Sequence, residues 1–211
     1  MNEAVIFAIL LILAGCASQN IERTEGDEIK LSEPAYEGRV SLENALAERR
    51  AERSFTAEPL KLDEVSQILW ASQGIDGVTG ATRTAPSAGA TQPLVVYLIA
   101  ADVTGLEPGA YRYDPSKHTA TKVSEISEGL PYGAPAYVIF TAIYERTSQR
   151  YGDRGERYVH IEVGHSAQNV HLQAISLGLK TFPIGAFDDG FVSRLLSLEN
   201  EVPLYVVPVG R

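Results

Sequence analysis

Several features that are common in proteins are scarce or missing in this chain of 211 residues. It has one cysteine, which excludes a disulfide within the chain. Its net charge of -9 argues against a general nucleic-acid binder, because phosphate contacts need a surplus of lysine and arginine on at least one face. Neither G-x-G-x-x-G nor G-x-x-x-x-G-K-[ST] occurs, which disfavours a Rossmann or P-loop nucleotide site.

Long apolar runs are also scarce, and the longest lies at the N-terminus. Residues 4–14 fall well short of the roughly 20 residues of a membrane-spanning helix, but they suit the apolar part of a signal peptide. The following Cys16 completes a sequence, LAGC, of the lipobox type, so we expect lipidation of Cys16 and a lipid anchor on the extracytoplasmic face of the cell membrane. Because Glu3 precedes the run and no lysine or arginine does, an unprocessed N-terminal anchor or a misplaced start codon, with a cytoplasmic protein, is the alternative.

The remaining composition is that of one ordinary globular domain, with 45% hydrophobic and 21% charged residues. We divide the chain into a signal peptide with its lipobox at 1–16, a flexible tether at 17–40 and a folded domain at 41–211. The tether is polar, rich in Glu and Asp, and without a helical or strand period.

Hydrophobic patterns predict helices and strands throughout the folded part. A helix over 42–50 would be capped by Ser41 and would bury Leu42, Ala45 and Leu46. Continuous apolar runs at 94–102 and 135–144 predict buried strands. The other predicted elements are helices at 62–73, 161–177 and 188–198, a hairpin at 109–115 and 118–124, and strands beginning at 180 and 203. The sum is an α+β protein with helices around a mixed central sheet.

The histidines do not have the spacing of a metal site. Glu162 and His165 form a Glu-x-x-His pair, but carboxylate-bridged di-iron sites need a second such pair, and none occurs. His160, His165 and His171 are five and six residues apart, which scatters them around a helix. We therefore expect packed or hydrogen-bonded histidines and no metal.

The segment RTAPSAGATQP at 83–93 raises the question of a nucleophilic serine at Ser87. The G-x-S-x-G elbow of hydrolases needs glycine two residues before the serine, where this chain has Ala85. The segment is better interpreted as a loop with little side-chain bulk, which lets backbone N–H groups approach a flat or anionic ligand.

Three arginines in AERRAERSF, Arg49, Arg50 and Arg53, offer the planar forked donors that phosphate groups select. Together with the ordered series PSAGATQP, RYVHIEVGHSAQN, LGLKTFPIGAF and a final PVGR, this segment resembles the nitroreductase family of flavoproteins, and within it the SagB-type dehydrogenase branch. The resemblance runs from about residue 46 to 211. It implies a nitroreductase-like α+β fold, a homodimer, and flavin mononucleotide (FMN) as cofactor.

The resemblance also implies which residues bind FMN. The arginine segment would hold the phosphate, the ribityl chain and the pyrimidine edge, although Ala51 stands where the family usually has serine. The loop at 86–88 would contact the flavin of the neighbouring subunit, and the turn at 183–186 would cover the ring near N5. The implied cofactor-binding residues are Arg49, Arg50, Arg53, Pro86, Ser87, Ala88, Pro183, Ile184, Gly185, Ala186, Gly210 and Arg211.

The implied activity is transfer of hydride or electrons through the flavin, from a reduced donor such as NADH or NADPH to a small organic acceptor. The flavin performs the redox chemistry, so no catalytic acid or base is obligatory. The branch includes azoline (thiazoline or oxazoline) oxidases of peptide maturation, described with a Lys-Tyr pair, for which Arg150 and Tyr151 are the nearest candidates here. Because arginine does not deprotonate, this activity is an alternative, as is a non-catalytic, surface-anchored binding lipoprotein.

Overall fold

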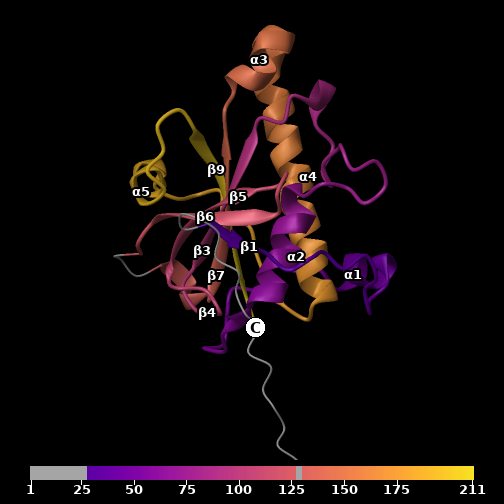
Figure 1. The fold of residues 1–211 in the computed structure, drawn as a ribbon, viewed down its shortest axis with the longest axis vertical. Helices are drawn as coiled ribbons and strands as arrows, with labels where there is room; N and C mark the ends of the chain where they lie inside the picture. Colours follow the sequence, from indigo (N-terminus) through magenta and orange to yellow (C-terminus); the bar gives the residue numbers. More distant parts are fainter. Residues whose placement is uncertain (1–27, 127–129) are drawn as a thin grey trace, which may run out of the picture.

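The computed structural model describes residues 28–126 and 130–211 (Figure 1). The expectations for the signal peptide and for Cys16 therefore lie outside the described residues. No helix of the described residues is long and apolar enough to cross a membrane.

The core of the fold is a seven-stranded sheet with the strand order β1-β6-β5-β3-β7-β9-β8. Its strands are β1 (Glu28–Lys30), β3 (Leu94–Ala100), β5 (Gly109–Asp114), β6 (Thr119–Ser124), β7 (Ala136–Ala142), β8 (Lys180–Thr181) and β9 (Val202–Gly210). Every strand pairing within this sheet is antiparallel. A short hairpin joins β5 and β6, whereas long connections that contain further helices and strands separate pairs such as β3–β7 and β7–β9. The α+β class is confirmed, but the sheet is antiparallel where the sequence predicted a mixed one. The parallel pairing of the described residues joins two short strands outside it, β2 (Leu60–Lys61) and β4 (Val103–Thr104).

Helices cover both faces of the sheet (Figure 1). The α-helices are α1 (Leu42–Glu48), α2 (Leu62–Gln73), α3 (Glu145–Tyr151), α4 (Gly155–Ser176) and α5 (Asp189–Leu195). Short 3-10 turns are η1 (Ala88–Ala90), η2 (Pro131–Gly133) and η3 (Gly152–Arg154). The long helix α4 packs with α1 and α2 on one side, while α5 lies on the other.

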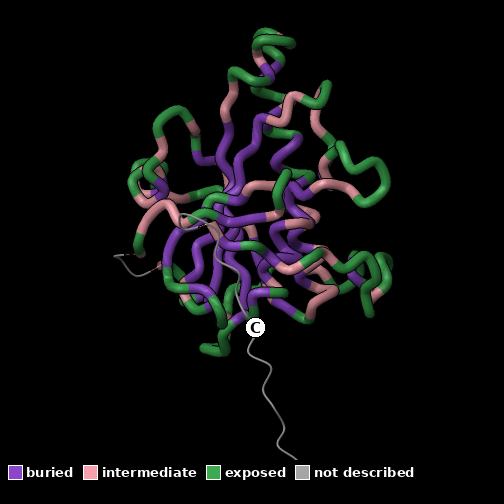
Figure 2. The backbone as a smooth tube through the Cα atoms, in the orientation of Figure 1, coloured by how far each residue is buried: buried purple, intermediate pink, exposed green. Residues whose placement is uncertain are grey.

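The two central strands contribute to both hydrophobic clusters, one on each face. In β3, Val96 and Leu98 belong to the cluster with α2 and α4, whereas Val95 and Ile99 belong to the cluster with α5. Successive strand side chains point to opposite faces, so a strand covered on both sides is apolar without interruption. The buried residues at the centre of Figure 2, drawn in purple, include these strands. The buried strand predicted at 94–102 is confirmed as β3.

The predicted tether is wrong over residues 28–40. Strand β1 pairs with β6, and the chain then runs along α2. The N–H of Ser32 donates to Ser66 Oγ over 3.1 Å, and the N–H of Ala35 donates to Gln67 Oε1 over 2.8 Å. Polar side chains of α2 thus replace water as partners of this segment, a long-range pairing that local composition does not reveal.

Helix α1 departs in part from the prediction. Ser41 caps it as predicted, with its Oγ accepting from the N–H of Asn44 over 3.2 Å. Only Ala45 is buried, whereas Leu42 and Leu46 remain 60% and 53% exposed. The apolar stripe that predicted burial is therefore largely open to solvent in the single chain.

Candidate functional site

The arginine segment that follows α1 lies beside β8. The N–H of Glu52 donates to the carbonyl of Thr181 over 3.2 Å, which fixes the segment to the sheet edge. The Arg53 guanidinium carbon lies 5.2 Å from the centre of the Phe182 ring, a cation–π distance. Arg53 is thereby placed next to Pro183, the first residue of the predicted turn.

The C-terminal residues meet the same segment. The N–H of Thr56 donates to the carbonyl of Arg211 over 2.7 Å. At Gly210 the Phe55 side chain packs so closely on the backbone that an added Cβ would lie 2.8 Å from its ring. The structure thus brings together three predicted parts of the site: the arginine segment, the turn and the C-terminus.

The Arg211 side chain, however, already has carboxylate partners. Its Nε lies 2.9 Å from Glu58, and a terminal nitrogen contacts Glu64 at 2.5 Å. A phosphate at Arg211 would have to compete with both carboxylates.

The other three guanidinium groups carry uncompensated charge. Within the described residues, Arg49, Arg50 and Arg53 form no ion pair. Burial, with the nearby charge of Arg49, lowers the pKa of His171 to about 4, so this histidine is neutral at pH 7. Three positive charges within five residues suit an anionic group such as a phosphate.

The turn at 183–186 presents open backbone next to these charges. Ile184 exchanges two hydrogen bonds with Val206 of β9, over 2.8 and 3.1 Å, which holds the turn against the sheet. Gly185 and Ala186 are exposed, and the nearest atom to an added Cβ at Gly185 would be a Tyr205 ring carbon at 3.7 Å. A flat ring with polar edges can therefore approach this backbone, which fits the group that the sequence predicts.

The backbone is strained directly after the predicted loop at 86–88, where three residues have positive φ angles. Gly89, Ala90 and Gln92 have φ angles of 57°, 55° and 47°. Ser87 Oγ accepts from the N–H of Gln92 over 2.9 Å, so this hydroxyl closes its own loop. A cofactor contact of Ser87 would accordingly use the backbone.

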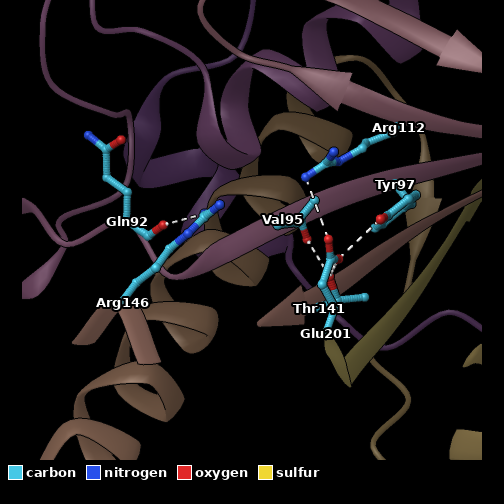
Figure 3. Close-up of polar contacts among 7 residues, drawn as sticks. All are labelled: Gln92, Val95, Tyr97, Arg112, Thr141, Arg146 and Glu201. Carbon is cyan, nitrogen blue, oxygen red and sulfur yellow. Dashed lines mark hydrogen bonds and ion pairs between the residues drawn. The ribbon is translucent and has the colours of Figure 1, made fainter. Parts of the chain in front are cut away.

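Helix α3 holds this loop from outside. Arg150 Nη1 donates to the carbonyl of Gly89 over 3.0 Å. Arg146 Nη1 donates to the carbonyl of Gln92 over 3.0 Å (Figure 3). An added Cβ at Gly89 would lie 2.5 Å from the Tyr151 hydroxyl oxygen. The structure therefore joins the candidate pair, Arg150 and Tyr151, to the loop at 86–88.

Figure 3 also shows a polar cluster around Glu201. Its carboxylate accepts from the Tyr97 hydroxyl over 3.1 Å and from Thr141, and lies 3.5 Å from Arg112. The cluster anchors the start of β9 and supplies no open site.

Residues 46–211 match the family model described as the nitroreductase family. The chain belongs to the nitroreductase family. It is 43% identical to a Methanocaldococcus jannaschii protein whose name assigns it provisionally to the nitroreductases, over 88% of this chain and 98% of that protein. The family consists of flavin-dependent oxidoreductases, so this nitroreductase is an enzyme of that type.

Solved structures support the same fold. A Ralstonia eutropha structure, also named provisionally as a nitroreductase, is 28% identical with a TM-score of 0.76, and covers 90% of this chain and 92% of that one. A chain of the E. coli microcin synthetase McbBCD complex with truncated pro-MccB17 bound has a TM-score of 0.68 at 20% identity, over 99% of this chain and 84% of that one. At that identity the second likeness shows the fold alone.

The single nitroreductase chain does not bring the two halves of the site together. Ser87 lowers the pKa of Glu162 on α4, and Arg49 lowers the pKa of His171 on the same helix, so the loop lies near Glu162 and the arginine segment near His171. Nine residues along an α-helix correspond to about two and a half turns, so these positions lie on opposite sides and roughly 13 Å apart along the axis. In Figure 1, α1 and α3 correspondingly lie at opposite ends of α4.

Glu162 is the residue whose environment the sequence did not reveal. It is buried at 2% exposure, whereas His165 is exposed, so this Glu-x-x-His pair does not converge. No group of three or more His, Cys, Asp or Glu side chains in the described residues is arranged to hold a metal ion. Burial raises the pKa of Glu162 to about 7, against the opposing effects of hydrogen bonds from Ser87 and Gln73 and the charge of Arg83.

Proposed function

We propose that this nitroreductase binds FMN and, as a homodimer, moves hydride or electrons from NADH or NADPH to a small organic acceptor. The observation that carries the proposal is the group of three unpaired arginines beside the open backbone of the turn at 183–186. When bound, FMN supplies the redox chemistry, and the protein binds and orients it.

Each part of the site has a distinct binding role. Arg49 and Arg50 take the phosphate, because their charge has no carboxylate partner among the described residues. Arg53, held over Phe182, lies next to the turn and takes the pyrimidine edge. The exposed N–H groups of Gly185 and Ala186 are donors for polar atoms at the ring edge. Arg211 would bind the phosphate only by exchanging its contacts with Glu58 and Glu64.

A second copy of the chain completes the site. The loop at 86–88 and the arginine segment lie on opposite sides of α4, so the loop serves the flavin of the partner subunit. Exposed apolar side chains support such a dimer: Leu42 and Leu46 on α1 are 60% and 53% exposed, and Ile161 on α4 is 49% exposed.

We also propose the SagB-type dehydrogenase branch; the chain lacks the Lys-Tyr pair of its azoline oxidases, but the nearest candidates, Arg150 and Tyr151, lie at the loop. The azoline oxidase alternative is weaker because Arg150 is a permanent donor to the Gly89 carbonyl and does not take up a proton as a base. A lipid anchor at Cys16 on the extracytoplasmic face remains our proposal for localisation. Replacing Cys16 with serine should release the protein from the membrane fraction, and retention would contradict the anchor.

The test is reconstitution of the purified protein with FMN, followed by visible absorbance and anaerobic titration with NADH and with NADPH. Arg49→Ala should raise the dissociation constant of FMN by roughly 10- to 150-fold, because a charge-assisted phosphate contact contributes about 1.5 to 3 kcal/mol. Lys30→Ala, which removes a positive charge on the exposed side of β1, is the control and should leave the constant unchanged. A wild-type protein that stays colourless would support a non-catalytic binding lipoprotein instead.

A further inference from the structure

A buried carboxyl group lies beneath the strained loop. Glu162 of α4 is 2% exposed, and its Oε1 has no hydrogen-bond partner among the described residues. Arg83, which precedes the loop, likewise has a buried Nη1 without a partner. A buried acceptor and a buried donor, each without a hydrogen-bond partner among the described residues, therefore lie in two groups whose charges interact.

The cluster closes the base of the loop. Ser87 interacts with Glu162 and accepts from the N–H of Gln92 over 2.9 Å. Arg83 Nη2 donates to Gln92 Oε1 over 3.2 Å, and its charge acts on Glu162. Both ends of the loop are therefore connected to one carboxyl group.

The loop needs this support because its backbone is strained. Ala90 and Gln92 have φ angles of 55° and 47°, which cost a residue with a side chain about 1 to 2 kcal/mol each. Such a conformation persists only where surrounding contacts fix it. A change in the contacts of Glu162 is therefore transmitted to the loop.

We propose that Glu162 is a positioning residue for the loop at 86–92, and that its protonated form keeps the loop closed while its ionised form favours opening. This proposal rests on the proposed function in one respect, namely that the loop at 86–92 contacts the flavin. Loop opening admits water to the carboxyl group, and a solvated carboxyl group prefers to ionise.

The groups that face Glu162 set the direction of the pH dependence. Arg83 and the polar side chains of Ser87 and Gln73 favour the ionised form of Glu162. Burial lowers the pKa of Arg83, whereas Tyr113 and Asp114 of β5 raise it and so help to keep Arg83 charged. Burial of Glu162 outweighs the groups that favour its ionised form and raises its pKa from the ordinary 4.5 to about 7. The closed loop is therefore fully favoured below pH 4.5 and loses this advantage as the pH rises to 7. A pKa difference of about 2.5 bounds the change in the opening equilibrium at roughly 300-fold.

Hydrogen exchange of the protein without FMN tests the proposal directly. Peptides covering 84–92 are followed by mass spectrometry at pH 5 and pH 8, and the rates are corrected for the intrinsic pH dependence of amide exchange. In the wild type, the corrected opening should be up to about 70-fold greater at pH 8 than at pH 5. In Glu162→Gln, which mimics the protonated form, it should stay constant. Glu156→Gln, on the exposed surface of the same helix, should behave as the wild type.

A second variant keeps the test decisive should Glu162→Gln fail to fold. Ser87→Ala removes the connection between Glu162 and the N–H of Gln92, so the loop should already be open at pH 5 and change little at pH 8. A loop that is equally closed at both pH values in the wild type would overturn the proposal, as would a pH response in Glu162→Gln equal to that of the wild type.

The dissociation constant of FMN, measured between pH 5 and pH 8, tests whether the loop conformation affects cofactor binding. The ratio of the wild-type constant to that of Glu162→Gln should rise with pH, and forming this ratio cancels titration of the FMN phosphate itself. No FMN binding by the wild type at any pH would contradict the proposed function and leave the exchange result standing. FMN binding with a ratio that does not change with pH would contradict the role of Glu162 alone.

Discussion

The contact between α3 and the loop predicts a greater loss of stability for Gly89→Ala than the backbone conformation alone would cause. Gly89 has a φ angle of 57°, and its new Cβ would lie 2.5 Å from the Tyr151 hydroxyl and 2.8 Å from Arg150 Nη1. The backbone conformation costs an alanine about 1 to 2 kcal/mol. The new Cβ meets the flexible ends of two side chains, so these can move aside, and the main further loss is the exposed hydrogen bond from Arg150 to the Gly89 carbonyl, which contributes about 0.5 to 1.5 kcal/mol. The free energy of unfolding should therefore fall by about 2 to 3 kcal/mol.

Gly80→Ala is the matched control for this variant. Gly80 has a φ angle of 65°, but an added Cβ there meets nothing within 4 Å. Its loss should be only the backbone cost of about 1 to 2 kcal/mol. Urea denaturation followed by the fluorescence of the single tryptophan, Trp70, measures both variants. Equal losses in the two variants would refute the role of α3 in holding the loop.

Three further predictions concern stability and the loop. Glu162→Gln should raise the free energy of unfolding at pH 8 by up to about 3 kcal/mol and leave it unchanged at pH 4, because the raised pKa of the Glu162 carboxyl group destabilises the fold as the pH rises from 4.5 to 7. Urea denaturation at several pH values measures this, and parallel stability curves for the wild type and the variant would contradict it. The wild type should lose stability as the pH falls from 6.5 to about 4, because His171 takes up its proton at a lower pH in the folded state than in the unfolded chain. His171→Leu should remove this loss, and an acid transition that is unchanged in the variant would contradict the prediction. Arg150→Ala should increase hydrogen exchange at 86–92 and Arg150→Lys should restore part of the protection, while equal exchange in both would show that the contact with Gly89 is not needed.

Much of the fold could be predicted because local patterns and tertiary burial agree. The run at 94–100 is apolar at every position, and the structure buries it on both faces of the sheet. Gly74 and Gly178 end helical patterns where α2 and α4 end, since a helix terminus is decided by nearby residues. The α+β class followed from the alternation of such segments.

Other elements depend on partners distant in sequence. Helix α3, with the sequence ERTSQRY, has no apolar period, and contacts with the loop and α4 determine it. Strand β1 gains its hydrogen bonds from β6, about ninety residues away. Leu42 matches a buried position by its spacing, but it is 60% exposed among the residues that the structure describes.

The candidate site was predicted in its parts and not in its arrangement. The resemblance selected the arginines and the turn at 183–186, which the structure places side by side. It did not reveal that two carboxylates engage Arg211, because Glu58 and Glu64 reach it only through the fold. Glu162 was considered as a metal ligand, and only its burial and its contacts with Ser87 and Arg83 indicate a different role.

Subunit complementation tests most directly whether one flavin is held by two chains. One variant combines Arg49→Ala with Arg53→Ala, and the other carries Ala88→Trp in the loop. Each alone should bind little FMN when FMN is kept below the weakened dissociation constants. After the two are unfolded and refolded together, each mixed dimer should regain one intact site, and flavin absorbance should return in proportion to the mixed dimers formed. Mixed dimers without flavin would contradict the account.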